Sequence, residues 1–90
     1  MKYNTLNINV RIGSFFRKQR TLLGISSKNL GRKLNVSQQH ISRLERGETR
    51  FSLEFVLRLL NEFDKSLLDL IAEVFYEDTY EMLIEYQRQQ

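Results

Sequence analysis

The stretch GISSKNLGRKLNVSQQHISRLERG, residues 24–47, decides the fold of this 90-residue chain. It contains two short segments with helical spacing of apolar residues, separated by the turn 34–37. Ser26 and Ser37 are suited to cap the two helices at their N-termini, and Asn35 tolerates a left-handed backbone. The pattern predicts helices over residues 26–34 and 38–46 that meet at a steep angle, with Val36 plugging the corner.

The apolar pattern on either side of this stretch predicts further helices. One runs from about Asn9 to Leu23 and ends at Gly24, with an inward stripe that includes Ile12, Phe15, Phe16, Gln19 and Leu23. Two more follow the N-caps Ser52 and Ser66. Residues 76–90 are compatible with a helix or a strand, and their Glu, Met, Leu and Gln content favours a helix.

These elements define an all-α chain. We predict a flexible N-terminal arm over residues 1–8, a five-helix helix-turn-helix domain over residues 9–72, and a C-terminal helical extension over residues 73–90.

Charge is divided unevenly along the chain. Residues 1–50 carry 11 basic and 2 acidic side chains, whereas residues 51–90 carry 3 basic and 9 acidic ones. The net charges are therefore +9 and −6. A strongly basic half indicates a polyanionic partner, most often nucleic acid, although a solvated basic surface without a partner explains the charge alone equally well.

The outward face of the 38–46 helix is rich in side chains that read DNA bases. It carries Gln38, Gln39, Ser42 and Arg43, with Ser37 and Arg46 at its two ends. Gln can bond bidentately to adenine and Arg to guanine in the major groove. An ordinary capped helix with a polar face is the alternative, but the turn and the charge favour reading of double-stranded DNA.

At these residues the sequence resembles the Cro and C1-type (XRE-like) helix-turn-helix regulators, which include phage repressors, restriction-modification controllers and antitoxins. The resemblance runs from about Ile12 to Leu70 and is strongest over VSQQHISRLERG, residues 36–47. It implies a five-helix, phage-repressor-like domain that binds operator DNA, usually as a two-fold dimer. The SQQHISR string and the SSKNLG segment also resemble small regulators encoded beside bacterial fimbrial operons.

The resemblance implies roles for individual residues. Positions that contact bases in the family correspond to Gln38, Gln39 and Arg43, and we add Ser42. Those expected to contact phosphates are Ser27, Lys28, Ser37, Arg46, Thr49 and Arg50. Arg20 and Glu45 occupy the positions of a structural ion pair that locks the recognition helix to the domain.

Two positions depart from the family pattern. Most relatives have Gln at the position of Ser27, where it braces a phosphate and the recognition helix, and the serine of this chain is shorter. Gly31 stands where Ala is usual, and a mid-helix Gly costs about 0.5–1 kcal/mol relative to Ala.

The segment after Leu67 offers more apolar and aromatic side chains than a small core can cover. We predict that it pairs two copies, and the alternative is that it folds back as a sixth helix over its own core. The expected interface residues are Leu67, Ile71, Val74, Phe75, Tyr80, Leu83 and Tyr86. A palindromic operator would match such a homodimer.

The leading functional prediction is a dimeric, sequence-specific transcriptional regulator, and the alternative is an antitoxin with autoregulatory DNA binding. No catalytic residues, metal site, cofactor or small-molecule effector are expected, because the chain lacks cysteine, has a single histidine (His40) and shows no phosphate-binding or nucleophile motif. No stretch is apolar enough for a membrane span or secretory signal, so we predict a cytoplasmic, non-enzymatic protein.

Overall fold

The computed structural model describes residues 8–89, and for residues 77–82 the backbone only. Six helices follow one another in this part of the chain: α1 (Ile8–Leu22), α2 (Ser27–Leu34), α3 (Gln38–Glu45), α4 (Leu53–Glu62), α5 (Leu67–Val74) and α6 (Tyr76–Arg88). The all-α prediction is therefore confirmed, including the helix favoured over a strand after residue 75. The predicted arm lies outside the described residues, apart from Ile8, which begins α1.

Serine side chains start four of the helices. Ser26, Ser37, Ser52 and Ser66 each accept a hydrogen bond from the backbone N–H three residues ahead, at 3.0–3.1 Å. Such caps each contribute about 1 kcal/mol by satisfying an otherwise unpaired donor. In α5 the cap is reciprocal, because the Ser66 N–H also donates to Asp69 Oδ2 at 2.8 Å. All four predicted caps are present.

The core lies where α1, α4 and α5 meet the α2–α3 pair. Its centre is Phe16, which is 1% exposed and whose ring lies 5.2, 5.8 and 6.3 Å from the rings of Phe15, Phe51 and Phe63. The other buried apolar residues are Leu30, Leu34, Ile41, Leu44, Phe55, Val56, Leu59, Leu60, Leu70 and Val74. This single cluster joins five helices, α1 to α5, into one domain.

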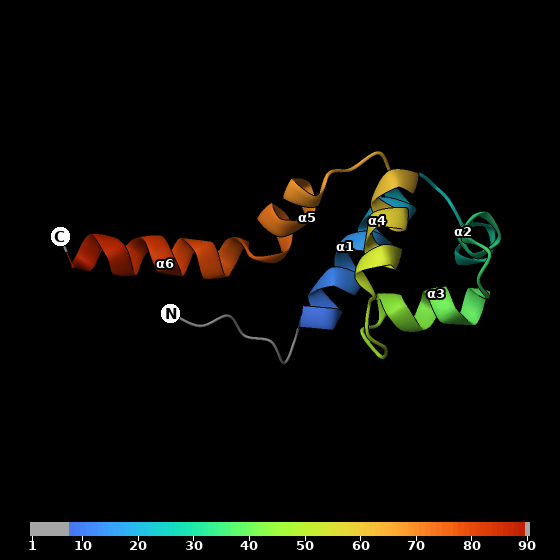
Figure 1. Cartoon of the computed structure of the whole chain (residues 1–90), viewed down its shortest axis with the longest axis horizontal. Helices are drawn as coiled ribbons and strands as arrows, with labels where there is room; N and C mark the ends of the chain where they lie inside the picture. Colours follow the sequence, from blue (N-terminus) through green and yellow to red (C-terminus); the bar gives the residue numbers. More distant parts are fainter. Residues whose placement is uncertain (1–7, 90) are drawn as a thin grey trace.

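Helix α6 stands apart from that domain. Figure 1 shows it extending away from the remaining helices as a continuation beyond α5, and the chain measures 52 × 24 × 21 Å along its principal axes. The extension therefore does not fold back over the core in this structure. Its apolar side chains Leu83 and Tyr86 are 52% and 61% exposed.

Two expectations about individual side chains were wrong. Leu23, predicted to face inward, is 59% exposed, because α1 ends at Leu22 and the chain turns at Gly24 with a φ of +68°. Val74, predicted in a dimer interface, is only 4% exposed and belongs to the core. Its side chain is almost wholly covered by its own chain, so it offers only a small part of the floor of a groove to a partner.

Candidate nucleic-acid interface

The turn between α2 and α3 fixes the direction of α3. Asn35 adopts the left-handed conformation (φ 59°, ψ 43°), and Val36 packs against the core as the corner plug. A Cβ at Gly31 would lie 2.6 Å from the carbonyl oxygen of Val36, closer than such contacts allow. The glycine at this position therefore permits the turn to approach α2 closely, which explains its departure from alanine.

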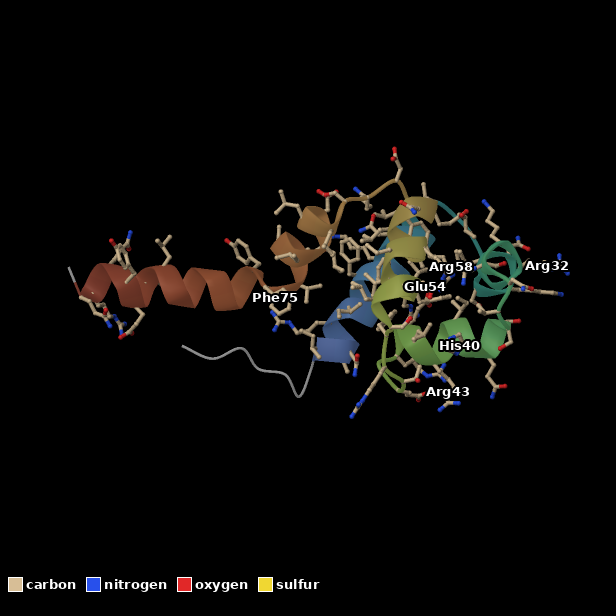
Figure 2. All side chains as sticks on the ribbon, viewed as in Figure 1. Arg32, His40, Arg43, Glu54, Arg58 and Phe75 are labelled. Carbon is tan, nitrogen blue, oxygen red and sulfur yellow. The ribbon has the colours of Figure 1, made fainter. Side chains whose placement is uncertain are left out.

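Helix α3 has one buried and one exposed face. Ile41 and Leu44 are buried, whereas Gln38, Gln39 and Arg43 are exposed and Ser42 is partly buried. Figure 2 shows Arg43 at the periphery of the molecule, directed away from the core. The four residues expected to contact bases thus lie on a helix whose opposite side is held by the core.

The loop after α3 brings three expected phosphate-contacting residues beside it. Arg46 and Arg50 are exposed and Thr49 is partly buried. The Glu48 N–H donates to the Arg43 carbonyl at 2.9 Å, so the loop turns back against the end of α3. Gly47 has a φ of +73°, and a Cβ there would meet Val10 of α1 at 2.6 Å.

Glu48 is an acidic group in this basic loop. Its Oε2 accepts a hydrogen bond from Arg46 Nη2 at 2.9 Å, and both side chains are about half exposed. That hydrogen bond lowers the pKa of Glu48, and the charges of Arg46 and Arg43 act in the same direction. The Arg46 guanidinium is therefore already paired with the Glu48 carboxylate.

The remaining expected phosphate contacts lie at two helix N-termini. Lys28 is exposed and Ser27 partly buried in the first turn of α2. Ser37 is exposed, but its hydroxyl already accepts the His40 N–H. Backbone N–H groups at a helix start favour an anion, so both termini are suited to phosphate.

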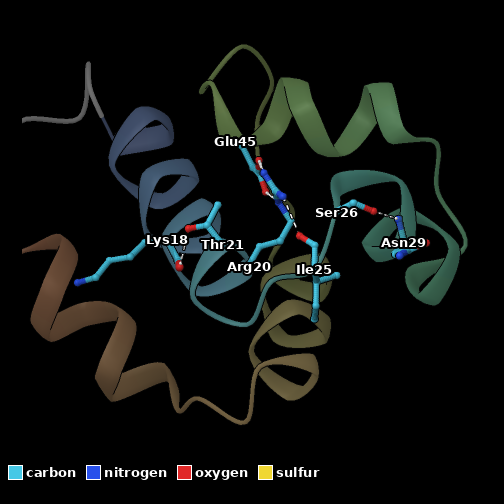
Figure 3. Close-up of polar contacts among 7 residues, drawn as sticks. All are labelled: Lys18, Arg20, Thr21, Ile25, Ser26, Asn29 and Glu45. Atoms are coloured by element: carbon cyan, nitrogen blue, oxygen red, sulfur yellow. Dashed lines mark hydrogen bonds and ion pairs between the residues drawn. The ribbon is translucent and has the colours of Figure 1, made fainter.

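A partly buried ion pair holds α3 to the rest of the domain. Arg20 Nε donates to Glu45 Oε2 at 2.7 Å and Arg20 Nη2 to Glu45 Oε1 at 2.9 Å, with side-chain exposures of 14% and 8%. Arg20 Nη1 also donates to the Ile25 carbonyl at 2.8 Å (Figure 3). The hydrogen bonds to Glu45 raise the pKa of Arg20 above its ordinary value, against the effect of burial. One guanidinium thereby ties α1, the loop before α2 and the end of α3 together.

Sequence reasoning missed Arg58. Its guanidinium donates to the Leu34 carbonyl at the end of α2 and lies 5.3 Å from the Phe55 ring centroid, while His40 of α3 meets the same ring edge-on at 5.8 Å. Arg58 is the single basic residue of α4, which was the available signal. The residue braces α4 against the helix-turn-helix.

The residues expected to pair two copies are distributed over α5 and α6. Leu67, Ile71, Leu83 and Tyr86 are exposed and Phe75 is partly buried. The side chain of Tyr80 lies outside the described part of the chain.

Within residues 8–89, every helix is too short or too polar to cross a membrane. Among the same residues, no three His, Cys, Asp or Glu side chains gather as a metal site would need.

A family model and curated relatives match this sequence. The sequence model of the helix-turn-helix family (HTH_3) matches residues 16–70. Proteins named uncharacterized HTH-type transcriptional regulators, from Sinorhizobium medicae (strain WSM419) and Rhizobium meliloti (strain 1021), are each 34% identical over 71 residues, which is 79% of this chain. The chain spans about half, 48%, of the length of these curated relatives.

Among solved structures, the clp gene regulator ClgR from Corynebacterium glutamicum is similar in fold. The TM-score is 0.73 at 22% identity, and the match covers 91% of this chain and 87% of ClgR. At this identity the match shows that the two chains share a fold.

Proposed function

Because this chain belongs to the helix-turn-helix family, we propose that it is a sequence-specific DNA-binding transcriptional regulator that reads the major groove with α3. Two relatives named as HTH-type transcriptional regulators support this role. Family membership identifies a binding protein and not an enzyme. The comparisons give no support to the antitoxin alternative, and the fimbrial-operon resemblance stays a prediction.

The observation that carries the proposal is the face of α3. Gln38, Gln39 and Arg43 project from a helix fixed by the core on one side and by the Arg20–Glu45 pair at its end. A side chain on a fixed helix loses little freedom when it binds, so its hydrogen bonds to base edges discriminate between sequences. Arg43 is suited to guanine, and the two glutamines to adenine.

The same surface offers groups for phosphates. We propose that Lys28, Arg46, Thr49 and Arg50 hold the DNA backbone on either side of α3, with Ser27 and Ser37 contributing at helix N-termini. These contacts carry little sequence information but set the position of the helix in the groove. The +9 charge of residues 1–50 supports binding to a polyanion, and the −6 of residues 51–90 keeps that half away from it.

We further propose that the protein acts as a homodimer on a palindromic operator. One α3 covers only a few base pairs, whereas two related by a two-fold axis would read half-sites about 34 Å apart. Leu67, Ile71, Phe75, Leu83 and Tyr86 supply exposed or partly exposed apolar surface for pairing, and Tyr80 is expected to join them. Such a role requires the cytoplasmic location that the sequence predicts.

Selection from random DNA tests the proposal. The protein is incubated with a pool of random duplexes, bound DNA is amplified over several rounds, and the enriched sequence is read. We expect a two-fold symmetric site that the protein binds about 10³-fold or more tighter than random duplex in fluorescence anisotropy at physiological salt. A pool that stays random after selection, with equal affinity for all duplexes, would contradict sequence-specific regulation.

A further inference from the structure

A groove lies between α1 and the end of α5, on the side from which α6 departs. It encloses about 860 Å³, with walls formed by Val10, Arg11, Ser14 and Lys18 of α1 and by Glu73 and Tyr76. Its floor is apolar, because Phe15 and Val74 line it from the core. The α1 residues recur at steps of three or four, so the groove follows one face of that helix.

Helix α6 leaves this groove uncovered in its own chain. It begins at Tyr76 on the rim and extends away from the domain (Figure 1). Its 13 residues make a rod about 20 Å long. Leu83 and Tyr86 lie exposed one turn apart on it, and Ile84 is partly buried. A soluble chain seldom leaves both an apolar helix face and an apolar groove open to water.

The charges of α1 and α6 are complementary. Helix α1 carries four basic and no acidic residues, of which Arg11 and Lys18 flank the groove. The α6 sequence carries four acidic residues, Glu77, Asp78, Glu81 and Glu85, against Arg88 alone. The sequence of α6 is therefore net negative and that of α1 net positive, which favours this pairing over the pairing of two acidic α6 helices.

The present contacts of the basic residues do not close the groove. Lys18 Nζ lies 2.7 Å from Glu73 Oε1, but the two side chains are about half exposed. Arg11 lies over the Phe75 ring at 5.7 Å from its centroid, at the point where α5 passes into α6. Exposed ion pairs contribute little to stability, so an arriving helix can rearrange the Lys18–Glu73 pair.

We propose that α6 of a second copy of this chain occupies the groove between α1 and α5, and that the two copies exchange their α6 helices reciprocally. The inference rests on the homodimer proposed above and specifies how it forms. An exchange of this kind is isologous, so each subunit gives one helix and receives one. The exchange buries the apolar floor of the groove together with the exposed Leu83 and Tyr86 of α6. It also links the two subunits, and therefore their α3 helices, at two symmetric contacts.

Engineered disulfides test the exchange without DNA. The chain contains no cysteine, so Ser14→Cys in the groove and Leu83→Cys on α6 supply the sole thiols. We expect the double variant, oxidised at low micromolar concentration, to run as a covalent dimer on non-reducing gels, and a mixture of the two single variants to form the same cross-linked dimer. Arg32→Cys is the matched control, because Arg32 lies on α2 at the end of the molecule opposite α6 (Figure 2). It should not cross-link to Leu83→Cys.

The other outcomes overturn the exchange. A disulfide within one chain would show that α6 folds back into its own groove. Cross-linking of Leu83→Cys only to itself would show that two α6 helices pair side by side, and absence of cross-linking would show that the groove stays empty. Circular dichroism checks the fold, and Tyr86→Cys replaces Leu83→Cys if the latter unfolds the protein. Because no DNA is present, failure here leaves DNA recognition standing, and failure of DNA binding leaves the exchange standing.

Charge reversal gives an independent measurement. Lys18→Glu should weaken dimerisation several-fold in sedimentation experiments, because it places a carboxylate against the acidic α6 of the partner. Arg17→Glu changes the same charge on α1 at an exposed residue outside the groove lining, and it should have a smaller effect. Equal effects of the two reversals would contradict docking in this groove.

Discussion

Removal of the Arg20 side chain is the sharpest test of how α3 is held. Arg20→Ala deletes two hydrogen bonds to Glu45 and one to the Ile25 carbonyl, and leaves the Glu45 carboxylate, 8% exposed, without its cation. Loss of one partner of a buried pair costs about 3–5 kcal/mol. Because Arg20 keeps some contact with water, we expect a loss in unfolding free energy near the lower value, about 3 kcal/mol. For a domain of this size, that corresponds to a fall in Tm of about 12–24 °C.

Calorimetric or circular-dichroism melts of the DNA-free protein measure this loss. Arg17→Ala, an exposed arginine on the same helix, is the control and should change the unfolding free energy by less than about 0.5 kcal/mol. The double variant Arg20→Ala, Glu45→Ala should be less destabilised than the sum of the single variants, because it leaves no buried charge unpaired. A melt of Arg20→Ala that coincides with wild type would refute the role of the pair.

Three further predictions concern other parts of the domain. Gly13→Ala would place a Cβ 2.4 Å from the Leu44 carbonyl oxygen, so it should push α1 away from α3. In urea titrations we expect it to lower the unfolding free energy by about 1–3 kcal/mol, whereas Ser14→Ala, at the neighbouring position, should be near neutral. Glu48→Gln should release Arg46 for phosphates and tighten binding to random duplex at low salt, and unchanged affinity would show that this ion pair does not compete with DNA. The pKa of Asp69 is lowered by hydrogen bonds from the Ser66 backbone and side chain, so the stability from this cap is present at neutral pH and is lost as the pH falls below about 4. Urea titrations should therefore show that the stability difference between wild type and Asp69→Asn shrinks on acidification, and a constant difference would contradict this.

Local sequence signals accounted for the helices and the turn. A serine N-cap, a left-handed Asn35 and a Gly C-terminal to a helix act through neighbouring backbone groups, so they can be recognised without the rest of the fold. The regular apolar spacing likewise identified most of the core. These signals were enough to predict the helix-turn-helix and the exposed face of α3.

The remaining features depend on contacts between distant segments. Leu23 and Val74 both fit an apolar stripe, and only the end of α1 and the packing of α5 decide that one is exposed and the other buried. The contact of Arg58 with the Leu34 carbonyl joins residues 24 positions apart, and no spacing rule predicts it. Helix α5 ends at Val74 and α6 begins at Tyr76, and at Phe75 between them no side chain caps the new helix, so no local signal marks the junction.

The central claim is that α3 reads bases while the following loop holds phosphates, and a comparison of Gln38→Ala with Arg50→Ala tests it most directly. Dissociation constants are measured by fluorescence anisotropy for the selected site and for random duplex over a range of salt concentrations. We predict that Gln38→Ala weakens binding to the selected site by about 5- to 150-fold and leaves binding to random duplex nearly unchanged. Arg50→Ala should weaken binding to both and lower the salt slope by about 0.9 for each phosphate that the variant no longer neutralises. Equal losses of affinity on the two duplexes for both variants would contradict the division of roles.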